Sequence, residues 1–272
     1  MKEKISLAGD LGSGKSTVSD ILIKMLDAEY YSTGRIVRAV AEKRGMTVVE
    51  LNKYMETHPE LDKEIDDGLV ELAKVDKRLI IDSRMAWHFT AGTFKVYLST
   101  DIETSALRIM GANRKGEHAV TLEETVKETQ ARRASEQKRY FEQYGVDIKD
   151  LSNYDLIVDT TVATPDEVAE CIATSFEKWL EDKSFSRAYI STERLNFPTD
   201  EPDAQLLSEL SARIELGEEI ELAKIAEKDG EFYVVDGAES AMAHAFSFAP
   251  FISAKLVKSE IRGEWVKMKN SL

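Results

Sequence analysis

The sequence is poor in the features that define secreted, membrane-bound and nucleic-acid-binding proteins. Its single cysteine, Cys171, permits no intrachain disulfide, which favours a reducing compartment. No apolar run approaches the roughly 20 residues of a membrane span, and the run at 5–8 is too short for a signal peptide. Lys and Arg (36) are outnumbered by Asp and Glu (50), and the net charge of -14 repels nucleic acids and anionic membranes. We therefore expect a cytoplasmic protein without a nucleic-acid or membrane partner, whose anionic ligands are small and tightly held.

The first 180 residues have the pattern of an α/β fold. Short β-type runs at 4–8, 78–82, 94–98 and 155–159, with another at 29–31, alternate with helical periods. Four segments fit a helix-capping box, in which Thr and a Glu three residues later satisfy backbone N–H groups, at 47–50, 100–103, 121–124 and 164–167. We expect the third of these helices to end at Gly145. The alternation predicts a parallel sheet wrapped by helices.

The character of the sequence changes after Trp179. A polar connector, EDKSFSR (181–187), precedes shorter mixed elements, among them a helix over 204–216 and a tight hairpin at Asp229-Gly230. We therefore expect two domains, an α/β domain over 1–182 and a small α+β domain over 185–272.

The stretch GDLGSGKST (9–17) matches the phosphate-binding loop pattern GxxxxGK[ST] in full, and it lies between a strand and a helix as its mechanism requires. Backbone N–H groups and the helix dipole surround a phosphate, Lys15 reaches the β- and γ-phosphates, and Ser16 ligates Mg²⁺. A purely structural glycine turn needs neither Lys15 nor Ser16. The expected ATP-binding residues are Gly9, Gly12, Ser13, Gly14, Lys15, Ser16 and Thr17.

A second element fits the same site, because the buried-type run LIID (79–82) ends in an acid. Beside a phosphate-binding loop we expect Asp82 to hold a Mg²⁺-bound water, although a strand-ending Asp is often only a turn residue. The four histidines show no metal-ligand spacing, so none is assigned to a metal. The sequence lacks the NKxD motif of GTPases, and its acidity does not suit a helicase. Which class of phosphate-binding-loop protein this is depends on the arginines elsewhere in the sequence.

Three further stretches, YYSTGRIVRAVAEKRGM, IDSRMAWHF and RRASEQKRYFEQYGVDIKDLSNYDLIVDT, resemble the cytidylate kinase family of nucleoside monophosphate kinases, especially its compact archaeal branch, over residues 4–180. The resemblance implies a three-layer P-loop NTPase fold with a parallel sheet. It also implies ATP and Mg²⁺ as donor and cofactor, and a nucleoside monophosphate, first CMP or dCMP, as acceptor.

The acceptor side is expected to be rich in arginine, because a monophosphate dianion needs bidentate guanidinium partners. The resemblance places the segment 32–38 in the monophosphate pocket and Arg84 on the acceptor phosphate. Arg132, Glu136 and Arg139 share one helix face, which is also the pattern of an exposed helix with ordinary ion pairs. The expected acceptor-binding residues are Ser32, Gly34, Arg35, Arg38, Arg84, Glu136 and Arg139.

The resemblance further implies a short lid over 108–121 and arginines that close over the transferring phosphoryl group. Arg108 is expected near the donor adenine, Arg114 lies in the lid, and the loop after Asp159 borders the adenine. The expected catalytic residues are Lys15, Arg84, Arg114, Arg132 and Arg139. The bacterial branch usually has Asp where this chain has Glu136, which leaves the base and sugar preference open.

The C-terminal part faintly resembles the ParB and sulfiredoxin-like fold, through the segment Asp236-Gly237-Ala238-Glu239-Ser240 between a strand and a helix. The His and Arg that carry phosphate chemistry there are absent. We expect an interaction or regulatory role, through a protein partner or self-association, and a plain structural appendage is equally open. For the whole chain, two alternatives to a nucleoside monophosphate kinase also stay open: a kinase for another phosphorylated or hydroxyl acceptor, and a non-catalytic nucleotide sensor.

Overall fold

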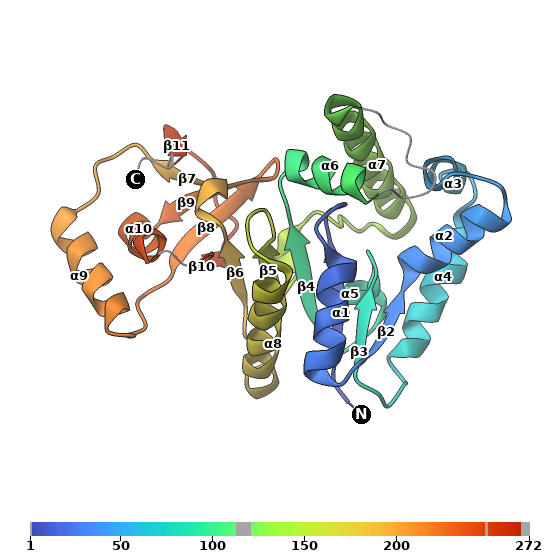
Figure 1. Cartoon of the computed structure of the whole chain (residues 1–272), viewed down its shortest axis with the longest axis horizontal. Helices are drawn as coiled ribbons and strands as arrows, with labels where there is room; N and C mark the ends of the chain where they lie inside the picture. The colour runs from blue at the N-terminus through green and yellow to red at the C-terminus, as the bar shows by residue number, and fades with distance from the viewer. Residues whose placement is uncertain (1, 113–120, 248–249, 268–272) are drawn as a thin grey trace.

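The computed structural model describes residues 2–112, 121–247 and 250–267, and these form one continuous eleven-stranded sheet with helices packed on it (Figure 1). The strand order is β11-β7-β9-β8-β10-β6-β5-β4-β1-β3-β2. The strands are β1 Lys4–Gly9, β2 Glu29–Ser32, β3 Leu79–Asp82, β4 Thr93–Ser99, β5 Leu156–Asp159, β6 Arg187–Ile190, β7 Leu195–Pro198, β8 Ala223–Lys228, β9 Glu231–Asp236, β10 Ile252–Leu256 and β11 Trp265–Lys267. The helices are α1 Lys15–Leu26, α2 Thr33–Lys43, α3 Val48–Met55, α4 Pro59–Leu72, α5 Ala86–Phe89, α6 Ile102–Gly111, α7 Leu122–Tyr144, α8 Pro165–Glu181, α9 Ala204–Glu215 and α10 Ala238–Phe246, with 3-10 turns at Leu151–Asn153 and Thr192–Arg194.

The first five strands are all parallel, and both faces of this part of the sheet are covered. Helices α1 and α8 pack on one face, and α4, α5 and α7 pack on the other. The central strand β1 is buried along its whole length, as its apolar run requires. The three-layer α/β fold and all five expected strands are therefore confirmed, each strand within about two residues of its predicted bounds.

The helix starts follow from local side-chain chemistry. Capping boxes form at Thr47, Thr121 and Thr164, and α7 ends at Gly145 in the left-handed conformation. The fourth predicted box, at 100–103, is wrong, because Asp101 caps α6 instead and accepts a hydrogen bond from the Thr104 N–H at 2.8 Å. The Thr100 N–H already donates to a buried carboxylate, which holds Thr100 at the end of β4.

The C-terminal part extends the same sheet. Strand β6 pairs in parallel with β5, and β10 then pairs antiparallel with β6. Helix α10 covers this part of the sheet and α9 lies outside α10 (Figure 1). The predicted hairpin is confirmed, since Asp229 and Gly230 both have positive φ and join β8 to β9. The expected boundary at 182–185 falls between α8 and β6, and the hydrogen-bonded sheet crosses it, so the division into two domains stays a proposal.

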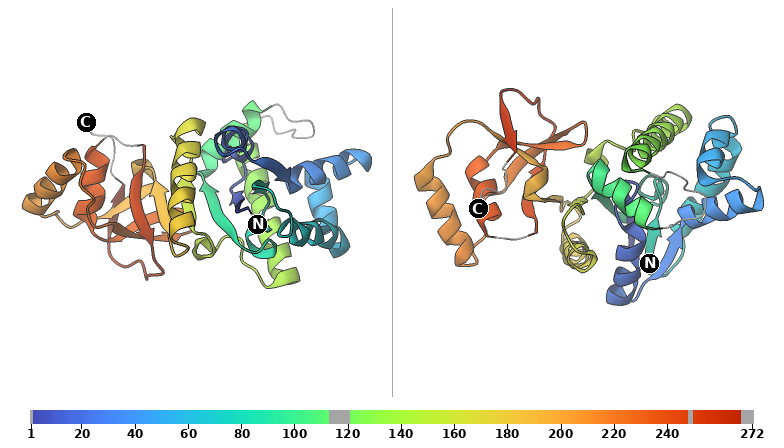
Figure 2. Two further views of the ribbon diagram at one scale, coloured as in Figure 1. Left: turned by 90° about the horizontal axis from the view of Figure 1, so that it is seen from below. Right: turned by 45° about the horizontal axis from the view of Figure 1, so that its top comes forward.

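The two parts lie side by side along the long axis, with α8 between them in both views of Figure 2. None of the described helices combines the length and the hydropathy needed to traverse a bilayer.

Candidate functional site

The glycine-rich loop turns tightly between β1 and α1. Gly9 and Gly12 both have positive φ, at 147° and 73°. A Cβ atom on Gly9 would lie 2.4 Å from the Leu98 carbonyl oxygen, and one on Gly12 would lie 2.5 Å from the Ser105 carbonyl oxygen. Neither position can hold a side chain without moving backbone. The loop therefore needs glycine at these positions for both conformation and space.

Lys15 folds back into this loop. Its Nζ donates to the carbonyl oxygens of Gly9 at 3.0 Å and Asp10 at 2.7 Å, and to the Ser13 hydroxyl at 3.3 Å. Burial, together with the positive charge of Arg84, lowers the pKa of Lys15 to about 7. The ammonium thus lies within the turn of backbone amides that suits a phosphate.

Asp10, a buried acid within the glycine-rich loop, ties the loop to neighbouring elements. The Asp10 carboxylate accepts hydrogen bonds from the Tyr97 hydroxyl at 2.9 Å, from the Thr100 N–H at 3.0 Å and from Lys149. Burial by itself raises the pKa of Asp10, but the charges of Lys149 and Arg133 hold it well below its ordinary value. Sequence reasoning missed this network, because Lys149 lies far along the chain and no motif links it to Asp10.

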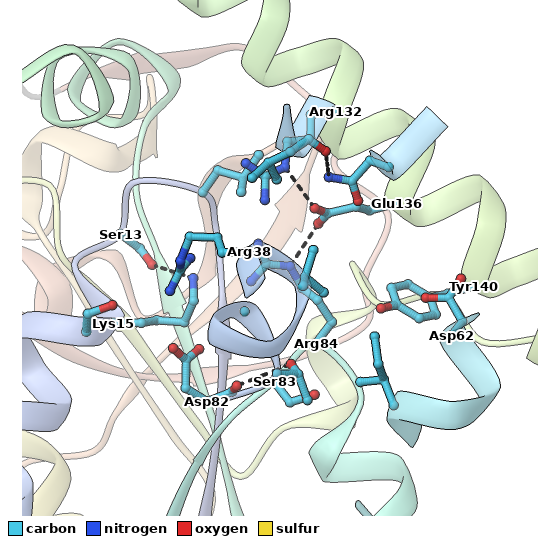
Figure 3. A pocket seen from close by; sticks show the side chains of 18 of the residues that line it. Ser13, Lys15, Arg38, Asp62, Asp82, Ser83, Arg84, Arg132, Glu136 and Tyr140 are labelled. Atoms are coloured by element: carbon cyan, nitrogen blue, oxygen red, sulfur yellow. Dashed lines mark hydrogen bonds and ion pairs between the residues drawn. The ribbon is translucent and has the colours of Figure 1, made fainter. Parts of the chain in front are cut away.

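One pocket joins the phosphate loop to the expected acceptor residues (Figure 3). It is bounded by the loop, α2, α3, α4, the end of β3 and α7. Among the predicted site residues it is lined by Gly12, Ser13, Gly14, Lys15, Ser16, Thr17, Gly34, Arg38, Asp82, Arg84, Arg132, Glu136 and Arg139. The fold therefore gathers residues from positions 12 to 139 around a single cavity.

Glu136 lies between two arginines inside this pocket (Figure 3). Its carboxylate pairs with the Arg84 Nε at 2.9 Å and with the Arg132 Nε at 3.1 Å, and the residue is only 6% exposed. Arg84 also donates to the Gly9 carbonyl oxygen at 3.0 Å. Burial raises the pKa of Glu136, but the two guanidinium groups outweigh it and lower this pKa to about 2. Glu136 is thus an anion that orients Arg84 and Arg132.

Arg139 forms an ion pair with Asp62, one of two buried acids on α4 that the sequence analysis missed. Its Nε lies 2.7 Å from an Asp62 carboxylate oxygen, and one of its Nη groups donates to the Asn52 carbonyl oxygen at 3.2 Å. Asp66, one turn later on α4, accepts a hydrogen bond from the Tyr144 hydroxyl at 2.9 Å. Burial raises the pKa of Asp62 to about 6 and that of Asp66 to about 7. The four-residue spacing was the only signal in the sequence, and it is common on exposed helices.

The carboxylate of Asp82 lies at the floor of the pocket, facing Lys15 (Figure 3). It accepts hydrogen bonds from the Tyr30 hydroxyl at 2.8 Å and the Ser32 hydroxyl at 3.3 Å. Among the described residues no group of three or more His, Cys, Asp or Glu side chains has metal-binding geometry. One carboxylate and the Ser16 hydroxyl fit a Mg²⁺ ion that takes its other ligands from water and substrate phosphates.

Several predicted residues lie outside the pocket lining. Arg35 stacks its guanidinium over the Tyr30 ring, 4.7 Å from the ring centroid, and Ser32 caps α2 through the Arg35 N–H. Gly9 contributes its carbonyl oxygen beneath the loop. Arg108 donates to the Thr160 carbonyl oxygen at 2.6 Å, which ties α6 to the segment after β5. Arg114 lies outside the described residues.

Comparison with known proteins finds similarity over the N-terminal part of the chain. A sequence profile of the cytidylate kinase-like family matches residues 4–162. A cytidylate kinase of Thermoplasma volcanium is 36% identical over 179 residues, which is 64% of this chain and 92% of the relative. A cytidylate kinase of Sulfurisphaera tokodaii is 38% identical over 170 residues, which is 62% of this chain and 92% of the relative. An S-adenosylmethionine-dependent nucleotide dehydratase of Lacinutrix mariniflava is 37% identical over 179 residues, which is 65% of this chain and 37% of that protein. A solved shikimate kinase structure from Bacteroides thetaiotaomicron is 16% identical, covers 66% of this chain and 98% of its own, and has a TM-score of 0.46.

Proposed function

Because this chain belongs to the cytidylate kinase-like family, we propose that it transfers the γ-phosphoryl group of ATP·Mg²⁺ to a pyrimidine nucleoside monophosphate, CMP or dCMP. The observation that carries the proposal is the shared pocket, in which a phosphate-binding loop faces arginines from α2, from the segment after β3 and from α7. Phosphoryl transfer between two nucleotides requires two anion sites that open into one water-poor space. The relatives named as cytidylate kinases support CMP as the first acceptor to test.

The donor side is formed by the phosphate loop. Backbone N–H groups of residues 12–17 and the N-terminus of α1 would bind the β-phosphate, and Lys15 would exchange its carbonyl partners for phosphate oxygens. Ser16 and Asp82 would hold Mg²⁺, which when bound neutralises charge on the β- and γ-phosphates.

The acceptor side is formed by arginines. Arg84 and Arg38 would bind the monophosphate, and Arg132 and Arg139 would face the phosphoryl group during transfer. Glu136 keeps Arg84 and Arg132 aligned before a nucleotide arrives, which reduces the rearrangement needed for the reaction. Arg114, from the expected lid, would complete the set.

The proposal is tested by measuring ADP formation from ATP·Mg²⁺ with each nucleoside monophosphate in turn, with Lys15→Ala as the blank. We expect turnover with CMP or dCMP, and at least a ~100-fold loss in Arg84→Ala, because that guanidinium lines the pocket where the acceptor phosphate would bind. Arg213→Ala is the matched control, since Arg213 lies on α9 in the C-terminal part, far along the chain from the pocket residues, and pairs with Glu218.

Two other results would redirect the assignment. Turnover confined to another phosphorylated or hydroxyl compound would replace the acceptor and leave the donor site as proposed. Measurable ATP binding with no turnover on any acceptor would favour a nucleotide sensor.

A further inference from the structure

A buried arginine of the C-terminal part grips the segment that follows β5. Arg194, in the 3-10 turn Thr192–Arg194, is 5% exposed. One of its Nη groups donates to the Asp159 carboxylate at 3.1 Å and to the Thr161 hydroxyl at 3.2 Å, and the other donates to the Gly230 carbonyl oxygen at 2.6 Å. A single guanidinium therefore joins the end of β5, the segment after it and the β8–β9 hairpin.

The Asp159 carboxylate is completely buried and is the centre of this contact. One oxygen accepts the Thr161 N–H at 3.1 Å and the Thr161 hydroxyl at 2.7 Å, and the other accepts the Ser191 N–H at 3.2 Å and the Ser191 hydroxyl. A carboxylate removed from water needs a positive partner, and Arg194 supplies it. Two of these residues, Ser191 and Arg194, lie beyond the region that matches the family profile.

The same segment is held from its other side by α6. Arg108 donates to the Thr160 carbonyl oxygen at 2.6 Å and to the Thr160 hydroxyl at 3.2 Å, and the Asp101 N–H donates to the Thr161 hydroxyl at 3.2 Å. Thr161 is therefore a shared acceptor for Asp101, at the start of α6, and for Arg194. The position of residues 160–161 is determined jointly by the kinase-like part and the C-terminal part.

We propose that Arg194 is a positioning residue for the donor-nucleotide site, and that the C-terminal part fixes the segment 160–164 through Asp159 and Thr161. The family resemblance leads us to expect this segment beside the adenine. The inference rests on the proposed function, which makes ATP the donor nucleotide, and on the expectation that the segment after β5 borders its adenine. A C-terminal part that served only as an appendage would affect stability and leave nucleotide affinity unchanged.

The test uses the full chain with Arg194→Ala and Arg194→Lys. The matched control is Asn196→Ala, because Asn196 is also buried, lies two residues further along and donates to the Phe232 carbonyl oxygen inside the C-terminal strands. For each chain we would measure the dissociation constant of ATP by calorimetry without acceptor, the KM values of both substrates, kcat and the melting temperature. Hydrogen exchange of the Thr160 and Thr161 amides would report the order of the segment directly.

We expect Arg194→Ala to weaken ATP binding about 3- to 30-fold, the range of energetic coupling between packed elements, and to raise the KM of ATP with little change in the KM of the acceptor. The two amides should exchange faster. Arg194→Lys should recover only part of the affinity, because an ammonium group cannot donate to Asp159, Thr161 and Gly230 in the planar geometry of the guanidinium. Asn196→Ala should melt at a lower temperature and bind ATP normally.

The proposal is overturned if Arg194→Ala binds ATP as tightly as the unmodified chain, or if Asn196→Ala weakens ATP binding as much. Should Arg194→Ala fail to fold, Arg194→Lys replaces it in this comparison: weaker ATP binding by Arg194→Lys than by Asn196→Ala supports the proposal, and equal binding overturns it. ATP binding without phosphoryl transfer would refute the proposed function and leave this comparison valid. No ATP binding by the unmodified chain would refute both.

Discussion

Glu136 carries a negative charge that pairs with two arginines of the pocket, and replacing it with glutamine tests how much the protein depends on that charge. Glutamine has nearly the same shape and can still accept one hydrogen bond, but it cannot balance the charges of Arg84 and Arg132. We expect Glu136→Gln to fold with a lower free energy of unfolding, and the loss to depend on pH.

The size of the loss follows from the pKa of Glu136. A fall from the ordinary value of 4.5 to about 2 in the folded protein corresponds to about 3 kcal/mol of stability. Removing one partner of a buried ion pair costs about 3–5 kcal/mol, and the arginines here, each about one fifth exposed, favour the lower end. We therefore expect Glu136→Gln to be less stable by about 2–3 kcal/mol at pH 7.

The sign of the pH dependence is fixed by the direction of the shift. A carboxyl group whose folded-state pKa is lowered stabilises the protein fully above its unfolded pKa of 4.5, and this contribution disappears as the pH falls toward 2. The stability difference between the two chains should therefore be constant from pH 7 to about 5, and more than half of it should be gone by about pH 3.

Urea unfolding followed by far-UV circular dichroism at pH 7, 5, 4 and 3 measures this difference. Urea is uncharged and leaves the ion pairs unscreened. Glu142→Gln is the control, because Glu142 lies on the same helix, is 64% exposed and meets Lys138 only at 3.9 Å, so its effect should stay within about 0.5 kcal/mol. A Glu136→Gln chain as stable as the unmodified one at pH 7, or a difference that does not shrink in acid, would refute the reasoning.

Three further predictions concern other groups of the pocket. Burial lowers the pKa of Lys15 to about 7, so its amine is mostly neutral at pH 8.5 and should take up about one proton when the phosphates of ATP bind beside it. Calorimetry in buffers of different ionisation enthalpy measures this uptake, and equal uptake by Lys15→Met would disprove the prediction. Burial raises the pKa of Asp66 to about 7, so this carboxyl group lowers the free energy of unfolding as the pH rises from about 4 to 7. In urea unfolding, Asp66→Asn should be as stable as the unmodified chain at pH 4 and more stable by on the order of 2 kcal/mol at pH 8. The opposite trend would contradict the prediction. Gly12→Ala should weaken ATP binding at least ~10-fold in the same calorimetric assay, because its Cβ would meet the Ser105 carbonyl oxygen, whereas Gly45→Ala, with positive φ but no atom within 4 Å, should bind ATP normally.

The parts of the fold that depend on neighbours in the chain were predictable from the sequence. The phosphate loop needs glycine at fixed spacing, the strands need continuous apolar runs, and three Thr caps work through residues only three positions away. The failure at Thr100 marks the limit of this reasoning. Its N–H is claimed by Asp10, 90 positions earlier, so a long-range hydrogen bond overrode a local motif.

The contents of the pocket were only partly visible in the sequence. The sequence motif predicts the same role for Arg35 and Arg38. In the structure Arg38 lines the pocket, whereas Arg35 stacks over the Tyr30 ring. The acids Asp62 and Asp66 carried no motif, and their burial against α7 could not be read from their spacing. Which face of a helix is buried depends on what packs against it.

The sequence by itself determined the phosphate loop, the parallel sheet and the family. Each depends on residues close together in the chain: glycines at fixed spacing, continuous apolar runs, and short motifs within residues 4–162. Tertiary structure alone decided that Arg84 pairs with Glu136 and that Asp10 pairs with Lys149. It also decided that Arg194 reaches back to Asp159 across the expected domain boundary. These contacts join residues 35 to 139 positions apart in the chain, and each pairs a buried carboxylate with a cation that only the packing of the sheet and helices brings near.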